Sequence, residues 1–306
     1  MKKILLINTG GTLSSTDKGE GLSPDIAAEE ILGYIPELRE ELVLHALQIF
    51  SIESPDLVPS QWGQIVRCIR SNYEDYDGFV LIHGTDTLAY TSSALSRMIK
   101  GGNKPIVITG AQYSIEETVT DAVKNLLDSC RFAANWEGGG VYVVFHGHIM
   151  LGDHVKKIRG KDFEGFESVT APDVGRIYGR EIRISGSFLQ SDTAPDFQDQ
   201  IEDKVFLLKF YPGITPDLYD FVKDHFRGVV LECYGLAGIP HNFIPLIEMW
   251  NQLGIAILVC TQCTYQGTDL SLYTVGHYLT KERLVEEGRE MTCEAAMTKL
   301  MVSLAQ

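Results

Sequence analysis

The chain has 306 residues, of which 44% are hydrophobic and 22% are charged, a composition close to that of ordinary globular proteins. Its 41 acidic side chains outnumber its 26 basic side chains and give a formal net charge of −15. A surface this acidic repels the phosphates of nucleic acids and the head groups of anionic lipids, so neither nucleic acid nor a membrane is an expected partner. The length is sufficient for two domains of ordinary size.

The start of the chain and its cysteines indicate a cytoplasmic protein. The first apolar run, residues 4–7, is much shorter than the apolar core of a signal peptide or a membrane-spanning helix. The six cysteines are too sparse for a disulfide scaffold, which favours reduced and buried thiols.

Short runs of Val, Ile, Leu and Phe bounded by Gly or Pro recur along the chain, with amphipathic segments between them. Such runs are typical of strands that are buried on both faces of a parallel sheet. We expect strands at residues 4–7, 79–83, 106–109, 141–145, 205–210, 229–233 and 255–260.

The segments between these runs predict helices. Apolar residues at helical intervals follow Ser60, and the pair Ser23-Pro24 has the residue types of an N-cap and a first helical position. The alternation predicts two α/β domains with mostly parallel sheets, a larger N-terminal one and a smaller C-terminal one. We place them at 1–188 and 204–306, joined by an acidic linker at 189–203 that contains Pro195.

Polar residues at the ends of predicted strands are the candidates for a site, because ligands of open parallel sheets bind beyond the carboxyl ends of the strands. Any one such segment is more often a helix cap, but their recurrence favours a common site. A P-loop needs a lysine and a dinucleotide loop needs a third glycine, and these segments have neither. The segments are Thr9-Gly10-Gly11-Thr12, Glu53-Ser54-Pro55-Asp56, His83-Gly84-Thr85-Asp86-Thr87 and Thr109-Gly110-Ala111-Gln112.

A threonine hydroxyl becomes a nucleophile only when a base accepts its proton. Lys156 and Lys157 follow the strand expected at 141–145. A partly desolvated lysine beside Thr85 and Asp86 can act as that base through a hydroxyl relay. From spacing alone, however, two surface lysines on a solvated loop are the more common arrangement.

These motifs resemble those of the bacterial L-asparaginase/glutaminase family. The segment 75–91 and the triplet Thr261-Gln262-Cys263 are especially similar to the cytoplasmic type I enzymes, and the resemblance covers nearly the whole chain. It implies the asparaginase fold and hydrolysis of L-asparagine to L-aspartate and ammonia through an acyl-enzyme intermediate. It also implies a homo-dimer or homo-tetramer, with no cofactor and no metal.

The resemblance assigns roles residue by residue. Thr12 corresponds to the primary nucleophile, Thr85 to the second catalytic threonine and Asp86 to the carboxylate that binds the substrate's α-ammonium group. Lys157 stands nine residues before Phe166, as the family's catalytic lysine does, whereas Lys161 has the wrong spacing. The predicted catalytic residues are thus Thr12, Thr85, Asp86 and Lys157. The predicted substrate-binding residues are Glu53, Ser54, Pro55, Thr85, Asp86 and Ala111.

A second, regulatory site for asparagine is also implied by the type I resemblance. Cys260 and Cys263 within this region form a C-x-x-C pair, for which core packing is an equally good interpretation. Redox chemistry is a weaker one, and a structural zinc would lack two ligands. The residues predicted for the regulatory site are Tyr234, Gly235, Leu236, Thr261 and Cys263.

Three positions depart from the family pattern. The family usually has a tyrosine about a dozen residues after the nucleophile, but residues 20–24 contain none. Either another residue, of which Tyr34 is the nearest, or a partner subunit orients Thr12, or Thr12 is activated in a different way. Residues 236–240 read Leu-Ala-Gly-Ile-Pro where many members have an asparagine. Ala122 follows Asp121 where a glycine is frequent, which we attribute to packing.

Two alternative functions remain at this point. The first is a non-catalytic amino-acid sensor on the same scaffold, favoured by the missing tyrosine. The second is the ammonia-producing subunit of a tRNA-dependent amidotransferase. Those subunits carry an extra N-terminal domain, for which this chain is expected to have no room before Thr12, and a net charge of −15 suits RNA poorly.

Overall fold

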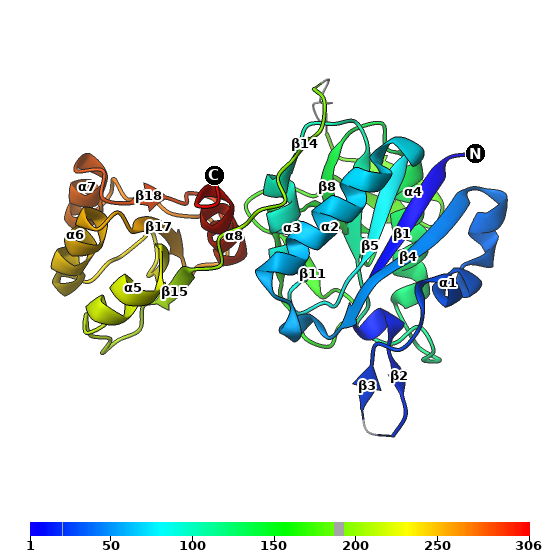
Figure 1. The fold of residues 1–306 in the computed structure, drawn as a ribbon, viewed down its shortest axis with the longest axis horizontal. Helices are drawn as coiled ribbons and strands as arrows, with labels where there is room; N and C mark the ends of the chain where they lie inside the picture. The colour runs from blue at the N-terminus through cyan, green and yellow to red at the C-terminus, as the bar shows by residue number, and fades with distance from the viewer. Residues whose placement is uncertain (20, 187–192) are drawn as a thin grey trace. The chain divides into compact units, whose positions relative to one another are not determined.

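The computed structural model describes residues 1–19, 21–186 and 193–306. They form two compact units, Met1–Asp199 and Gln200–Gln306 (Figure 1). The predicted linker at 189–203 lies partly outside the described residues. Its remainder contains β14 (Asp196–Phe197), which pairs with β6 (Ile99–Lys100) of the first unit.

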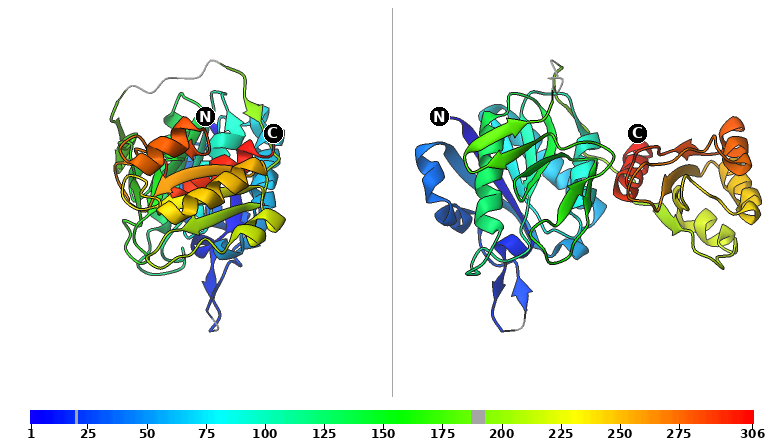
Figure 2. Two further views of the ribbon diagram at one scale, coloured as in Figure 1. Left: turned by 90° about the vertical axis from the view of Figure 1, so that its left-hand side faces the viewer. Right: turned by 180° about the vertical axis from the view of Figure 1, so that it is seen from behind.

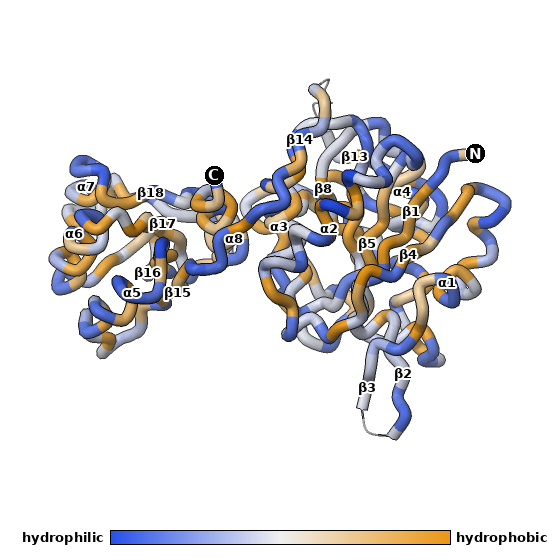
Figure 3. The backbone as a smooth tube through the Cα atoms, viewed as in Figure 1, coloured by the Kyte–Doolittle hydropathy of each residue, from blue (hydrophilic) through white to orange (hydrophobic). Residues whose placement is uncertain are grey.

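The first unit is built on a mixed sheet with the strand order β13-β12-β9-β8-β7-β5-β1-β4. Strands β4, β1, β5, β7 and β8 are parallel, whereas β9, β12 and β13 continue the sheet in antiparallel pairs. The central strands β1, β5, β7 and β8 are buried along almost their whole length, as expected for strands covered on both faces, and the interior of the unit is apolar (Figure 3). The bounds are β1 (Lys3–Gly10), β4 (Val43–Ile52), β5 (Gly78–Ile82), β7 (Pro105–Thr109), β8 (Gly140–Phe145), β9 (His148–Leu151), β12 (Gly175–Tyr178) and β13 (Glu181–Ile184).

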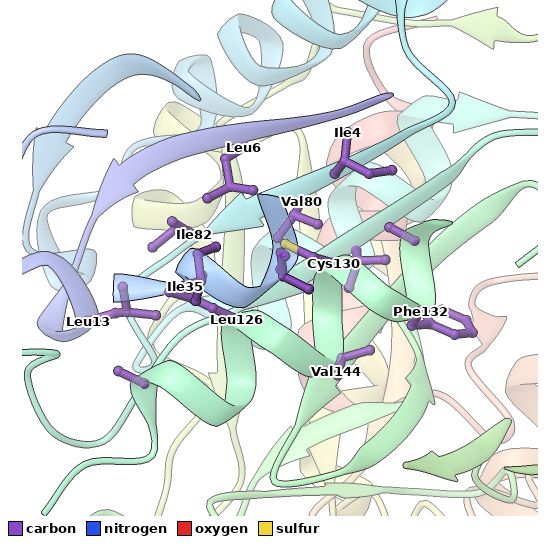
Figure 4. Packing of buried hydrophobic residues seen from close by; sticks show 14 of the residues in the cluster. Ile4, Leu6, Leu13, Ile35, Val80, Ile82, Leu126, Cys130, Phe132 and Val144 are labelled. Carbon is purple, nitrogen blue, oxygen red and sulfur yellow. The ribbon is translucent and has the colours of Figure 1, made fainter. Parts of the chain in front are cut away.

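Helices cover both faces of this sheet. Alternate strand residues such as Leu6 and Ile82 pack with Leu126 and Cys130 of α4 in a fully buried cluster (Figure 4). Side chains of the other parity point to the opposite face, which α2 and α3 cover (Figure 1). The helices are α1 (Ala28–Ile31), α2 (Pro59–Asn72), α3 (Leu88–Met98) and α4 (Ala122–Asn135).

The second unit has a four-stranded parallel sheet in the order β15-β16-β17-β18. One face packs with residues from α5, α6 and α7 in a second apolar cluster, and α8 packs against β15, β16 and β17. The prediction of two α/β domains with mostly parallel sheets is therefore confirmed. The elements are β15 (Val205–Lys209), α5 (Tyr219–His225), β16 (Gly228–Cys233), α6 (Ile244–Gln252), β17 (Ala256–Thr261), α7 (Thr274–Lys281), β18 (Glu286–Glu287) and α8 (Cys293–Ser303).

One predicted helix start is wrong. Ser23 ends a short strand, β3 (Leu22–Ser23), and pairs with Thr16 of β2 (Thr16–Asp17) in a hairpin that projects from the first unit (Figure 2). The Ser23 hydroxyl donates to the Asp25 carboxylate at 3.3 Å, and α1 begins only at Ala28. The Ser-Pro pair is a local signal, and it carries no information on whether the serine pairs with a distant residue in a strand.

None of the helices in the described part of the chain is both long enough and apolar enough to cross a lipid bilayer.

Candidate active site

Glycines allow the ends of β1, β4 and β5 to touch one another. Gly11 has a φ of +83°, and a Cβ there would lie 2.3 Å from the Cα of Gly84. A Cβ on Gly84 would in turn lie 2.6 Å from the side chain of Ser54, which follows β4. No larger residue fits at either position without moving backbone, so the two glycines bring three of the four predicted segments into direct contact.

Thr12 lies directly beyond this contact, at the start of a 3-10 turn over Thr12–Ser14. The turn is held by its own backbone and by the Gly11 N–H, which donates to the Ile52 carbonyl at 3.0 Å. Within the described residues the half-buried Thr12 hydroxyl makes no hydrogen bond to the protein. Its position and free lone pairs suit a nucleophile.

Lys157 contacts both functional groups of the second motif. Its Nζ donates to Thr85 Oγ1 at 2.7 Å and to Asp86 Oδ1 at 2.7 Å. The lysine ends β10 (Val155–Lys157), which pairs with β11 (Phe166–Ser168) so that Lys157 lies opposite Phe166. These distances are within the reach that proton transfer requires.

Ser54 and Asp86 are neighbours beside the Lys157 contacts. The buried Ser54 Oγ accepts the Asp86 backbone N–H at 3.2 Å, and the Thr87 hydroxyl donates to the Ser54 carbonyl at 2.9 Å. Because the Ser54 oxygen accepts one bond, its own proton remains to be donated to a ligand. The flanking Glu53 and Pro55 are exposed.

His83 fixes the backbone that precedes Thr85. Its Nδ1 lies 2.8 Å from the Gly84 carbonyl, which can only accept, so Nδ1 carries the proton. Its Nε2 then accepts from the Thr91 hydroxyl at 2.9 Å, and Thr91 accepts the Trp62 indole N–H at 2.9 Å. Burial lowers the pKa of His83 to about 4. The sequence motif contains His83 but gives no signal for this role, which depends on contacts between helices.

The turn after β7 is organised by a buried carboxylate. Asp121 accepts the Gln112 N–H at 3.0 Å and the Tyr113 N–H at 3.2 Å, and burial raises the pKa of this carboxyl group. The preceding Ala111 is completely buried. Ala122, the residue that departs from the family pattern, is also fully buried and belongs to the core cluster.

Tyr34 makes no hydrogen bond to Thr12 in the described part of the chain. Burial together with the charges of Glu116 and Glu30 raises the pKa of Tyr34. The neighbouring Ile115 N–H donates to the Leu13 carbonyl at 3.1 Å, within the nucleophile's turn. Tyr34 is thus close to the charge of Glu116, next to a residue that contacts this turn, and its role in orienting Thr12 stays a prediction.

The two segments predicted for the regulatory site touch each other. The Thr261 hydroxyl donates to the Gly235 carbonyl and accepts the Cys263 N–H at 3.0 Å. A pocket of about 370 Å³ borders the first segment, but its opposite wall is the start of α7 rather than Thr261 or Cys263. Residues 273–276 were not predicted from the sequence, because they do not directly follow a strand. The pocket is lined by residues 234–239, His241 and residues 273–276.

The C-x-x-C pair is divided between two environments. Cys260 is buried in β17, whereas Cys263 is exposed. Interaction with Cys260, together with burial, raises the pKa of the Cys293 thiol in α8. Thiols buried in apolar surroundings are poorly reactive, which favours packing for Cys260.

Family models match both units of the chain. The model described as "Asparaginase, N-terminal" matches residues 3–189, and the "Glutaminase/Asparaginase C-terminal domain" matches residues 204–306. The chain belongs to the asparaginase family. The resemblance seen in the motifs is therefore confirmed.

Individual family members match over almost their whole length. L-asparaginase from Thermococcus kodakarensis is 34% identical over 305 residues, which are 99% of this chain and 92% of that protein. A solved structure of the thermostable L-asparaginase from the same organism superposes with a TM-score of 0.92 and covers 99% of this chain and 93% of that one. L-asparaginase 1 from Escherichia coli is 30% identical over 318 residues, 100% of this chain and 92% of that protein.

A second group of family members has a different name. One subunit of the glutamyl-tRNA(Gln) amidotransferase from Pyrococcus abyssi is 34% identical over 316 residues. The match covers 98% of this chain but 72% of that protein.

Proposed function

We propose that this member of the asparaginase family hydrolyses L-asparagine to L-aspartate and ammonia. The observation that carries the proposal is the position of Lys157 Nζ, 2.7 Å from Thr85 Oγ1 and 2.7 Å from Asp86 Oδ1. A lysine amine held against a hydroxyl and a carboxylate, beside a free threonine hydroxyl at the end of the neighbouring strand, is a suitable arrangement for acyl transfer.

The proposed reaction uses Thr12 as the nucleophile. Its oxygen attacks the side-chain amide carbon while its proton passes through the Thr85 hydroxyl to Lys157, which accepts it as the uncharged amine. Backbone N–H groups of the glycine-rich turns stabilise the negative oxygen of the tetrahedral intermediate. The C–N bond then breaks, the amide nitrogen leaves as ammonia with the relayed proton, and water hydrolyses the ester to release aspartate and restore Thr12.

The head group of the substrate is assigned to Asp86 and Ser54. Asp86 is mostly exposed and carries the negative charge for an α-ammonium group, and Ser54 has a proton to donate to an α-carboxylate. Fixing both ends of the head group positions the side-chain amide at Thr12. The exposed Glu53 and Pro55 flank Ser54 and complete the proposed binding surface, whereas Ala111 is fully buried and its part in substrate binding stays a prediction.

The comparisons support an asparaginase over the amidotransferase component. Identity is 34% to both kinds of relative, so it does not discriminate between them. The main support is structural, because a solved L-asparaginase superposes on this chain with a TM-score of 0.92. A sensor is disfavoured because recognition of an amino acid requires no lysine on the Thr85 hydroxyl.

We further propose a cytoplasmic homo-dimer or homo-tetramer that asparagine activates at the pocket of the second unit. Six free thiols are typical of a reducing compartment. The Thr261–Gly235 hydrogen bond supports a common role for the two regulatory segments.

The deciding experiment is ammonia release by the purified chain from asparagine and, separately, from glutamine. We expect release from asparagine and none from the Thr12→Ala variant. Binding of asparagine without ammonia release from either amide would instead establish the sensor.

A further inference from the structure

The side-chain amide of Gln112 lies inside the loop that connects β10 to β11. Its Nε2 donates to the carbonyl of Asp162 at 2.9 Å and to that of Arg159 at 3.2 Å. A Cβ on Gly165 would lie 2.5 Å from the same nitrogen, so the glycine leaves the space that the amide occupies. The loop therefore folds around a side chain from another strand end.

Gln112 is itself held firmly on its own side. Its N–H donates to both carboxylate oxygens of Asp121 at 3.0 Å, and it follows the fully buried Ala111 at the end of β7. One residue thus connects a fixed strand end of the sheet to the loop at residues 158–165.

This loop begins immediately after Lys157. The N–H groups of Ile158 and Arg159 donate to the Gly165 carbonyl at 2.8 and 3.3 Å and close the loop. The Arg159 and Asp162 carbonyls are both acceptors, so a group with two N–H donors is needed to hold them together. We expect loss of that group to loosen the loop and, with it, the end of β10.

We propose that Gln112 is a positioning residue, which fixes the β10–β11 hairpin so that Lys157 Nζ stays within hydrogen-bond distance of Thr85. The inference rests on the proposed function, in which Lys157 is the base. A displacement of about 1 Å at a reacting group is sufficient to reduce a rate by ~10²-fold. The side chain of Gln112 contacts no substrate in this proposal and acts only through the hairpin.

The first test replaces the amide. Gln112→Met keeps the length of the side chain but removes both donors, and Gln112→Glu places a carboxylate against two carbonyl oxygens. We expect kcat for asparagine hydrolysis to fall by ~10–100-fold with KM changed less than about threefold, because Ser54 is untouched. Gln64→Met, at an exposed position of α2, is the matched control and should leave kcat unchanged. An unchanged kcat in Gln112→Met would overturn the inference.

The second test displaces the amide without changing Gln112. Gly165→Ala puts a methyl group where Nε2 lies and should reproduce the loss of kcat. Because both changes break the same two hydrogen bonds, the double variant Gln112→Met/Gly165→Ala should lose little more than either single variant. Fully additive losses would show that the two residues act independently and would contradict the inference.

A readout other than activity separates this inference from the proposed function. Amide hydrogen exchange at Ile158 and Arg159 should accelerate in Gln112→Met and stay unchanged in Lys157→Met. If Lys157→Met keeps full activity, the proposed base is wrong whatever the exchange shows. If Lys157→Met is inactive but Gln112→Met changes neither kcat nor exchange, only the role of Gln112 is overturned.

Discussion

Lys157 and Asp86 form an ion pair of 2.7 Å whose two partners are unequally buried, with 19% of the lysine side chain exposed and 60% of the aspartate side chain. The exposed carboxylate keeps lone pairs for a second cation, such as the α-ammonium group of an amino acid. The lysine is held instead against the Thr85 hydroxyl. An ion pair this exposed adds little to stability, so its removal should change the rate far more than the fold.

Replacement of Lys157 by methionine keeps the length and apolar bulk of the side chain but removes the proton acceptor. We expect kcat to fall by ~10²–10⁴-fold while asparagine still binds. Steady-state kinetics together with calorimetric titration of asparagine would measure both. Lys161→Met is the control, because Lys161 lines a separate surface pocket with Tyr113 and Phe163. Loss of activity in Lys161→Met alone would show that the base is misassigned.

Replacement of Thr12 by alanine should abolish turnover without unfolding the chain. The turn is held by backbone hydrogen bonds, including that from Gly11 to Ile52, and these do not involve the Thr12 hydroxyl. We therefore expect the free energy of unfolding to change by less than about 1 kcal/mol. Urea denaturation and ammonia release, measured on the same preparation, test the two parts. Appreciable residual turnover would exclude Thr12 as the nucleophile.

The burial of His83 predicts a pH-dependent loss of stability. Its pKa is about 4 in the folded chain and 6.5 in the unfolded chain, so between these values only the unfolded state takes up the proton. The free energy of unfolding should therefore fall as the pH drops from 6.5 toward 4, by up to about 3 kcal/mol from this group. Above pH 6.5 both states are neutral and the contribution does not change.

The variant His83→Asn isolates this contribution. Asparagine keeps a donor near the Gly84 carbonyl but does not titrate, so its unfolding free energy should depend less steeply on pH between 6.5 and 4. His277→Asn, at an exposed position of α7, is the control and should leave the slope as it is in the parent chain. Equal slopes for His83→Asn and the parent chain would contradict the buried neutral imidazole.

The strand ends could be predicted from the sequence because each carries its own local signal, a buried apolar run followed by glycine and a hydroxyl or carboxylate. Contacts between distant segments carry no such signal. Two examples depend on how loops pack. One is the insertion of Gln112 into the loop at 158–165, and the other is the contribution of α7 to the pocket of the second unit. At Ser23 the residue types of a helix start are present, but the prediction is wrong because Ser23 pairs with Thr16 in a hairpin.

The pocket of the second unit is the proposed site of regulation by asparagine. If asparagine activates the enzyme there, the rate should rise sigmoidally with asparagine concentration, with a coupling of ~1–3 kcal/mol between the two sites. Thr261→Val keeps the shape of the side chain but removes the hydroxyl that joins the Gly235 carbonyl to the Cys263 N–H. Its rate curve should become hyperbolic while kcat at saturation is kept, because Thr12 and Lys157 are untouched. Thr264→Val is the control and should remain sigmoidal. A hyperbolic curve for the parent chain at every enzyme concentration would exclude this form of regulation.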